Sequence, residues 1–147
     1  LPNDAALAAV IGHEVAHAVL RHGAERMSHA LLARLGQAGL NAAIASKSPA
    51  AVSAINAAYG VGANVGVLLP YSRKEELEAD YVGMIFMAKA GYDPTEAVAL
   101  WERMAEAKKG GSPPELLSTH PADATRINKL KEHLPQALVY YRRAVAH

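Results

Sequence analysis

The sequence predicts a mainly α-helical protein, and three observations support this. Alanine, the residue with the highest helix propensity, accounts for 31 of the 147 residues. Aromatic residues make up only 5%, and β-branched residues never alternate over a sustained run, so no β-strand is expected. Capping residues, glycines and prolines recur at intervals that suit helices. At this length we expect one domain over residues 1–147.

The first two helices are expected before residue 46. Asp4 can cap a helix that runs from residue 5 to about residue 22, and a second helix is expected over residues 24–45. Apolar residues recur at helical spacing in both, so we expect these residues to face a core. They are Leu7, Val10, Ile11, Val15, Ala18 and Val19 in the first helix and Met27, Leu31, Leu32, Leu35 and Leu40 in the second.

The third expected helix covers residues 50–67, and we expect Pro70 to end it. Residues 51–70 carry no charge, but they include Ser53, Asn56 and Asn64 together with three glycines. A membrane-spanning helix is normally more apolar than this. We therefore predict a buried helix here in preference to a membrane span.

Two helices are expected over residues 73–109. Ser72 and Glu75 have the spacing of a capping box, which predicts a helix over residues 73–90 with Gly91 just past its end. Asp93 can cap the next helix, which begins at Pro94.

The last helix is expected to begin at Pro121 and to end at Pro135, because proline suits the first helical turn and interrupts later ones. Residues 136–147 fit either a short helix or an extended segment.

Composition excludes several kinds of function. The net charge is +1 and the basic residues are scattered, which excludes the electrostatic footprint of a nucleic-acid-binding protein. Cysteine is absent, so disulfides and thiolate metal sites are excluded. The first residue is Leu1, so we expect the chain to be a piece of a longer precursor.

The most informative motif is His13-Glu14-Val15-Ala16-His17, an HExxH box on the first expected helix. Two histidines four residues apart on a helix point the same way, so both imidazoles can bind one metal ion. Glu14 lies about 100° round the helix, beside the open coordination position. This arrangement is typical of zinc peptidases, and it needs a third protein ligand.

Residues 75–80 are the best source of that ligand. Position 23, where one class of zinc peptidases has a third histidine, is Gly23, so the ligand must come from elsewhere. Glu76 and Asp80 are four residues apart and share one face of a helix. Solvated carboxylates are common in a first helical turn, which suits Glu75, whereas Asp80 lies deeper among apolar residues.

Three separated motifs occur in order along the chain. They are residues 7–17, Ser72-Arg73 with Glu76, Ala79 and Asp80, and Ser118-Thr119-His120-Pro121 with Arg126-Ile127. Together they resemble the zinc endopeptidase family that includes the CAAX prenyl endopeptidases and the HtpX and BepA-like peptidases, and most of all its soluble or lipid-anchored bacterial branch, which has mitochondrial quality-control relatives. The resemblance implies a zincin-like (gluzincin) helical catalytic domain. One departure from the family is expected: its N-terminal β-strands are largely absent from this chain, since only twelve residues precede His13.

The resemblance implies that His13, His17 and Glu76 hold Zn²⁺ and that Glu14 is the catalytic base. It also implies that Asp80 supports a ligating histidine by accepting its second ring N–H.

Two further residues have open roles. His120 either hydrogen-bonds the neighbouring backbone or faces the zinc, where it would donate to a developing oxyanion or fill the open position. Arg126 is expected to brace the loop by pairing with a carboxylate more than to touch substrate.

The resulting functional hypothesis is a zinc metalloendopeptidase that acts on protein or peptide substrates in envelope quality control. One alternative is a zinc-bearing interaction or chaperone-like module with silenced peptidase activity, and another is a purely structural helical domain. We expect a bacterial envelope location, periplasmic or membrane-associated through segments missing upstream. The sequence leaves the oligomeric state open.

Overall fold

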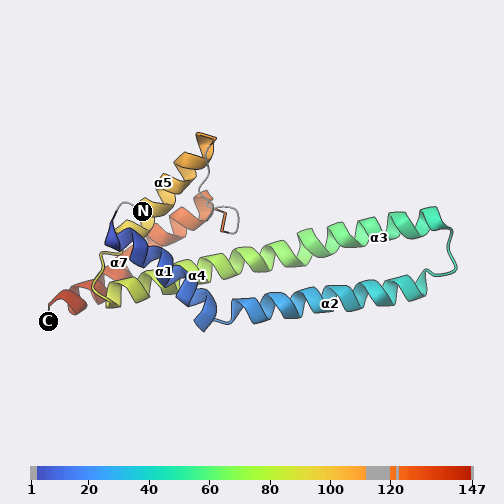
Figure 1. Ribbon diagram of the computed structural model, residues 1–147, viewed down its shortest axis with the longest axis horizontal. Helices are drawn as coiled ribbons and strands as arrows, with labels where there is room; N and C mark the ends of the chain where they lie inside the picture. The colour runs from blue at the N-terminus through green and yellow to red at the C-terminus, as the bar shows by residue number, and fades with distance from the viewer. Residues whose placement is uncertain (1–2, 112–119, 122, 147) are drawn as a thin grey trace. The chain divides into compact units, whose positions relative to one another are not determined.

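A computed structural model describes residues 3–111, 120–121 and 123–146 of the chain (Figure 1). Helices occupy most of these residues and no strand occurs among them, which confirms the predicted mainly α fold. The elements in order are α1 (Asp4–Val19), α2 (His22–Ala43), α3 (Pro49–Ala63), the π-helical turn η1 (Asn64–Leu68), α4 (Leu69–Lys89), α5 (Thr95–Lys109) and α7 (Ala124–Val145).

The chain divides into two compact units. The first unit contains Leu1–Leu20 and Glu76–His147, and the second contains Arg21–Glu75. The first unit therefore holds α1, most of α4, α5 and α7, while the second is a hairpin of α2 with α3, η1 and the start of α4. The expectation of a single domain stays a prediction.

The core of the first unit is formed by α1, α4, α5 and α7. Small residues of α1 pack against methionines of α4, the apolar face of α5 and two residues of α7. Close helix contact at alanines leaves room for the larger side chains of the facing helices. The buried core residues are Ala6, Ala9, Met84, Met87, Ala88, Ala97, Val98, Leu100, Trp101, Met104, Leu130 and Ala137.

The predicted inner face of α1 is wrong for most of its residues, although Val10 is partly buried against the core. Ala6, Ala9, Gly12, His13 and Ala16 are its buried residues. The large apolar residues point outward, with Leu7, Ile11, Val15 and Val19 between 44% and 60% exposed. Periodicity shows which residues share one face of a helix, but it does not show which face packs against the rest of the protein. In α1 the face with small residues and histidine is the one that is packed. The cap also differs, because Asn3 instead of Asp4 accepts the N–H of Ala6, at 2.7 Å.

The hairpin of the second unit has little buried surface. In α2 only His22 is buried, and α3 has no buried residue. Both the predicted inner stripe of α2 and the predicted burial of residues 51–70 are therefore wrong. By length and composition alone, the helix over Pro49–Lys89 could cross a membrane; it is the one such helix in the described part of the chain.

Pro70 does not end a helix, contrary to prediction. The chain continues from α3 through η1 into α4, and Ser72 lies inside α4, so no capping box forms there. In η1 the N–H of Leu69 bonds to the carbonyl of Asn64, five residues back. This wider turn rearranges the backbone hydrogen bonds directly before the missing N–H of Pro70.

The C-terminal elements follow the predicted signals with one exception. Gly91 has a φ of +84° just past α4, and the Asp93 carboxylate accepts the N–H of Thr95 at the start of α5. However, α7 begins at Ala124 and continues through Pro135 to Val145. Leu130 and Ala137 are buried on either side of Pro135, so tertiary packing holds this helix together across the proline.

The box helix crosses α4 at two glycines. A methyl group on Gly12 would lie 2.7 Å from the carbonyl oxygen of Gly83, and one on Gly83 would lie 2.7 Å from the backbone nitrogen of His13. Both close contacts are with backbone atoms, which cannot move aside as the end of a flexible side chain could. The two glycines therefore allow α1 and α4 to approach backbone to backbone, directly beside the HExxH box.

We predict that Gly83→Ala destabilises the first unit by about 1–3 kcal/mol or more, because the added methyl group overpacks this crossing. The measurement is urea unfolding followed by the fluorescence of Trp101, the one tryptophan of the chain. Gly110→Ala is the matched control, since a methyl group there would be 3.5 Å from its nearest neighbour. Equal unfolding midpoints for the two variants would contradict the prediction.

Candidate metal centre

The two box histidines meet on the buried side of α1. Their Nε2 atoms lie 3.1 Å apart, and His13 is 3% exposed. Between them, the Glu14 side chain is about half exposed, at 49%. The one-turn spacing of the histidines thus points both rings to one place while the intervening carboxylate faces solvent.

Glu76 reaches the same place from α4. One carboxylate oxygen lies 3.3 Å from Nε2 of His17, and the other lies 3.4 Å from Nε2 of His13. Glu76 is buried, although its neighbours in the sequence do not identify it as a buried residue. The crossing at Gly12 and Gly83 sets this approach, because it holds α4 against the box.

His120 completes the cluster from the segment before α7. Its Nδ1 lies 2.9 Å from Oε2 of Glu76 and 3.3 Å from Nε2 of His13, and its Nε2 lies 3.3 Å from Oε1 of Glu14. The side chain therefore faces the histidine and carboxylate group. The preceding motif residues Ser118 and Thr119 lie outside the described residues.

Asp80 and Arg126 form a buried ion pair beside the cluster. The guanidinium of Arg126 donates from Nε and Nη2 to the two Asp80 oxygens, both at 2.7 Å. Its Nη1 donates to the carbonyl of Pro121 and lies 3.0 Å from Glu76. Asp80 also lies 3.0 Å from Nδ1 of His13. Arg126 thus connects both carboxylates of α4 to the chain that carries His120.

Trp101 is a further residue of this site, and sequence reasoning missed it. The Arg126 guanidinium lies over its ring, 3.9 Å from the ring centroid, in cation–π geometry. The His13 ring meets the same indole edge to face at 5.6 Å. The available signal was that Trp101 is the one tryptophan of a chain poor in aromatic residues.

Electrostatics favour charged groups in this buried site. Burial by itself lowers the pKa of His13, but Asp80 and Glu76 outweigh burial and hold that pKa above its ordinary value. Burial likewise opposes ionisation of Glu76, yet hydrogen bonds from His120, His13 and His17 bring its pKa well below the ordinary value. Glu76 is therefore an ionised carboxylate inside the protein.

The donor set fits a metal ion. His13, His17, Glu76 and His120 each offer one ligand atom, and these atoms all lie within 4.8 Å of one another. Imidazole nitrogens with a single carboxylate suit zinc and other first-row metals better than calcium or magnesium, which prefer oxygen ligands.

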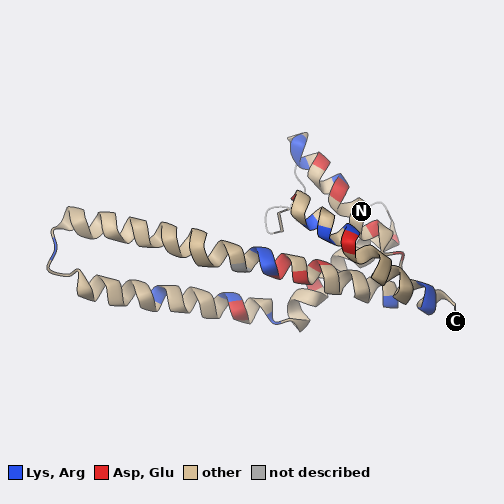
Figure 2. Ribbon diagram, turned by 180° about the vertical axis from the view of Figure 1, so that it is seen from behind, with Lys and Arg blue, Asp and Glu red and all other residues tan. Residues whose placement is uncertain are grey.

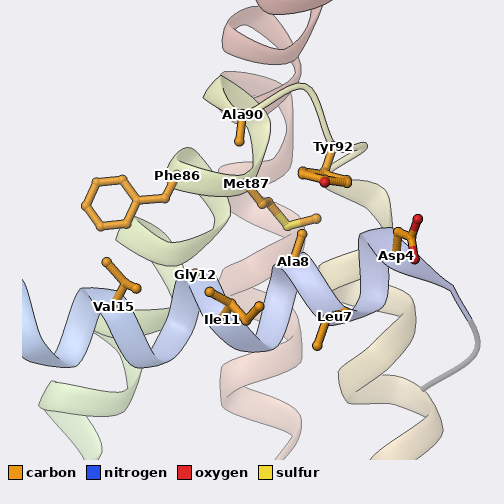
Figure 3. Close-up of a pocket in the computed structure, with 10 residues that line it drawn as sticks. All are labelled: Asp4, Leu7, Ala8, Ile11, Gly12, Val15, Phe86, Met87, Ala90 and Tyr92. Atoms are coloured by element: carbon orange, nitrogen blue, oxygen red, sulfur yellow. The ribbon is translucent and has the colours of Figure 1, made fainter.

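A separate apolar pocket lies on the other face of α1 (Figure 3). Leu7, Ile11 and Val15 line it from α1, while Phe86 and Tyr92 line it from α4 and the turn that follows. These α1 residues are about 120° to 160° round the helix from His13. The pocket, of about 370 Å³, is therefore not part of the histidine cluster.

We predict that Arg126→Met destabilises the first unit by about 3–5 kcal/mol, because it leaves the buried Asp80 carboxylate without its partner. Circular dichroism during urea unfolding measures the change. Arg142→Met, at an exposed position of the same helix, is the matched control and should shift stability by less than about 0.5 kcal/mol. Adding Asp80→Asn to Arg126→Met should restore part of the loss; no recovery in the double variant would contradict this account.

The chain is similar in sequence to known proteins. The model of peptidase family M48 matches residues 1–134. The mitochondrial metalloendopeptidase OMA1 of Schizosaccharomyces pombe is 40% identical over 134 residues, which cover 90% of this chain and 37% of that protein. OMA1 of Arabidopsis thaliana is 38% identical over 98% of this chain and 28% of its own length.

A bacterial relative is the beta-barrel assembly-enhancing protease of Escherichia coli strain K12, which is 31% identical over 85% of this chain and 26% of its own length. The chain thus spans between about a quarter and two fifths of these relatives. No solved structure matches it. The family match over nearly the whole chain confirms the resemblance predicted from the three motifs: this chain belongs to peptidase family M48.

Proposed function

We propose that this chain is the catalytic part of a zinc-dependent metalloendopeptidase that hydrolyses peptide bonds in proteins. The observation that carries the proposal is the convergence of His13, His17 and Glu76 from two crossing helices, with Glu14 next to them at the surface. Two histidines and one carboxylate are the protein ligands of a common class of catalytic zinc sites.

In this proposal His13, His17 and Glu76 hold the zinc ion. The ion supplies Lewis acidity, which activates a water molecule and polarises the peptide carbonyl. Ionised Glu76 and neutral imidazoles are the forms that bind a metal, and the lowered pKa of Glu76 keeps its carboxylate available.

Glu14 is the general base in the proposed reaction. Its carboxylate is half exposed, so a substrate and a water molecule can reach it. It takes a proton from the attacking water and passes that proton to the leaving amine. Because it follows His13 directly on a rigid helix, its distance from the metal ligands is fixed by the backbone.

Asp80 and Arg126 position the ligands. Asp80 lies 3.0 Å from Nδ1 of His13, where it can accept the second ring N–H and set the tautomer that leaves Nε2 for the metal. Arg126 neutralises Asp80 and lies beside Glu76, so it holds the two carboxylates of α4 in place.

The proposed setting is envelope protein quality control. The support is the similarity to a bacterial beta-barrel assembly-enhancing protease and to mitochondrial metalloendopeptidases, together with the motif resemblance. The substrates would be protein segments that reach Glu14 in an extended, unfolded form.

We predict that Glu14→Gln keeps one zinc ion per chain but lowers kcat/KM for casein cleavage by at least about 100-fold, because it removes the base and keeps the ligands. Metal analysis and a proteolysis assay on the same samples measure the two effects. Glu132→Gln, an exposed carboxylate on α7, is the control and should match the wild type. Full activity in Glu14→Gln would show that the base is another residue.

A second candidate function is a zinc-bearing interaction or chaperone-like module with silenced peptidase activity. The observation that favours it is His120, whose Nδ1 lies among the three proposed ligands, 2.9 Å from Glu76 and 3.3 Å from His13. From there His120 can fill the fourth position of a zinc ion and exclude water.

His120→Ala separates the two candidates. In a silenced module, the variant should gain chelator-sensitive cleavage of casein while its zinc content stays at one per chain. In the peptidase, where His120 donates to the oxyanion, the same variant should lose about 100-fold or more in kcat. His133→Ala, a histidine outside the cluster, serves as the control in both assays.

A further inference from the structure

The hairpin of the second unit exposes large apolar side chains on both of its arms. On α2 the exposed fractions of the four residues concerned run from 57% to 74%, and Val61 on α3 is 64% exposed. Exposed apolar side chains scattered singly are ordinary, but a series of them along two paired helices marks an interaction surface. The series comprises Met27, Leu31, Leu32, Leu35, Val61, Val65, Val67 and Leu69.

Charge is absent from most of one arm of the hairpin. Residues 48–72 contain no acidic, basic or histidine side chain, and Lys47 and Arg73 flank this run. These 25 residues make about 37 Å of helix, which exceeds the roughly 30 Å hydrocarbon thickness of a bilayer. Figure 2 shows α3 and the following turns free of coloured charges up to the start of the basic segment in α4.

Three polar side chains of the hairpin form hydrogen bonds between its two arms. Gln37 donates to the side-chain oxygen of Asn56 at 2.6 Å, and the Tyr59 hydroxyl donates to the carbonyl of Ala33 at 2.9 Å. Both bonds join α2 to α3. Elements in contact with lipid satisfy their polar groups internally in this way, because hydrocarbon offers no partner.

A protein partner explains these features less well than lipid does. A helix that docks on a protein has one apolar stripe and keeps charged residues on its other faces. The uncharged run on α3 and η1 has no charged face at all. A lipid surface also explains why the apolar residues occur on both arms.

The charge of the hairpin complements an anionic surface. Residues 21–75 contain six basic and two acidic residues, a net charge of +4, whereas the whole chain carries +1. Basic residues next to a membrane are attracted to anionic headgroups. Arg34 and Lys47 have long stems that can lie along the apolar layer while their charges reach the headgroups.

We propose that the hairpin formed by α2, α3 and η1 inserts the exposed apolar side chains named above into a lipid bilayer with anionic headgroups. This surface is distinct from the histidine cluster, and the inference depends on neither metal binding nor cleavage. It assigns membrane attachment to a segment within the described chain, between the HExxH box and the glutamate of α4.

The first test is flotation of the full chain with vesicles in a density gradient. Most of the chain should float with vesicles of mixed phosphatidylcholine and phosphatidylglycerol, and less should float with phosphatidylcholine alone. The double variant Val61→Asp, Val65→Asp should bind at least about 50-fold more weakly, because it carries charge into the apolar layer. Val139→Asp, an exposed valine of α7 in the first unit, is the matched control and should float like the wild type.

The second test reports where the bilayer touches the chain. Since the chain has no cysteine, Val61→Cys and Val139→Cys can each carry one environment-sensitive fluorophore. On addition of mixed vesicles, emission from position 61 should shift to the blue and be quenched by spin-labelled lipid tails, while position 139 should not change.

Three outcomes would overturn the proposal. The chain stays at the bottom of the gradient with both kinds of vesicle, or the double variant floats as well as the wild type, or the label at position 61 shows no shift. Sedimentation without lipid tests the competing explanation, which is self-association of the chain through the same surface. If the wild type self-associates, the double variant does not, and vesicles bind neither, then the surface joins two copies of the chain.

Discussion

The close crossing of α1 and α4 is the constraint on which the rest of the candidate site depends. Gly12 and Gly83 let the two backbones meet where any side chain would collide with the opposite main chain. This contact places the box histidines of one helix against the carboxylates of the other. A metal site assembled from two helices needs such a fixed crossing, because a shift of about 1 Å would separate ligands that must share one ion.

The crossing buries several ionisable groups, and Arg126 offsets the cost of burying the two carboxylates among them. Glu76 and Asp80 lie inside the first unit, where a carboxylate without a partner would be costly. The Arg126 guanidinium pairs with both and lies on the Trp101 ring, so one side chain connects α4, α5 and α7 around the cluster. Asp80, Arg126 and Trp101 are thereby held in position by their contacts, as are the proposed metal ligands beside them.

The apolar residues of this chain are distributed in an unusual way. Most buried core residues of the first unit are alanine or methionine, with Trp101, Val98, Leu100 and Leu130, whereas Leu7, Ile11, Val15 and Val19 of α1 and three leucines of α2 are exposed. On α1 the first three line the pocket of Figure 3, and on the hairpin the leucines accompany an uncharged arm. In α1 the face that carries the histidines is thus buried and the most apolar face is exposed, so the apolar face is free to contact another surface.

The sequence by itself determined the helical class and the family, and it named the residues proposed to hold the metal, because HExxH spacing and capping residues act over one or two helical turns. Only the tertiary structure decided which face of α1 is buried, that Pro70 and Pro135 lie within helices, and that Trp101 belongs to the site. These features depend on contacts between segments far apart in the chain. Periodicity describes a helix alone, whereas burial depends on what is packed against it.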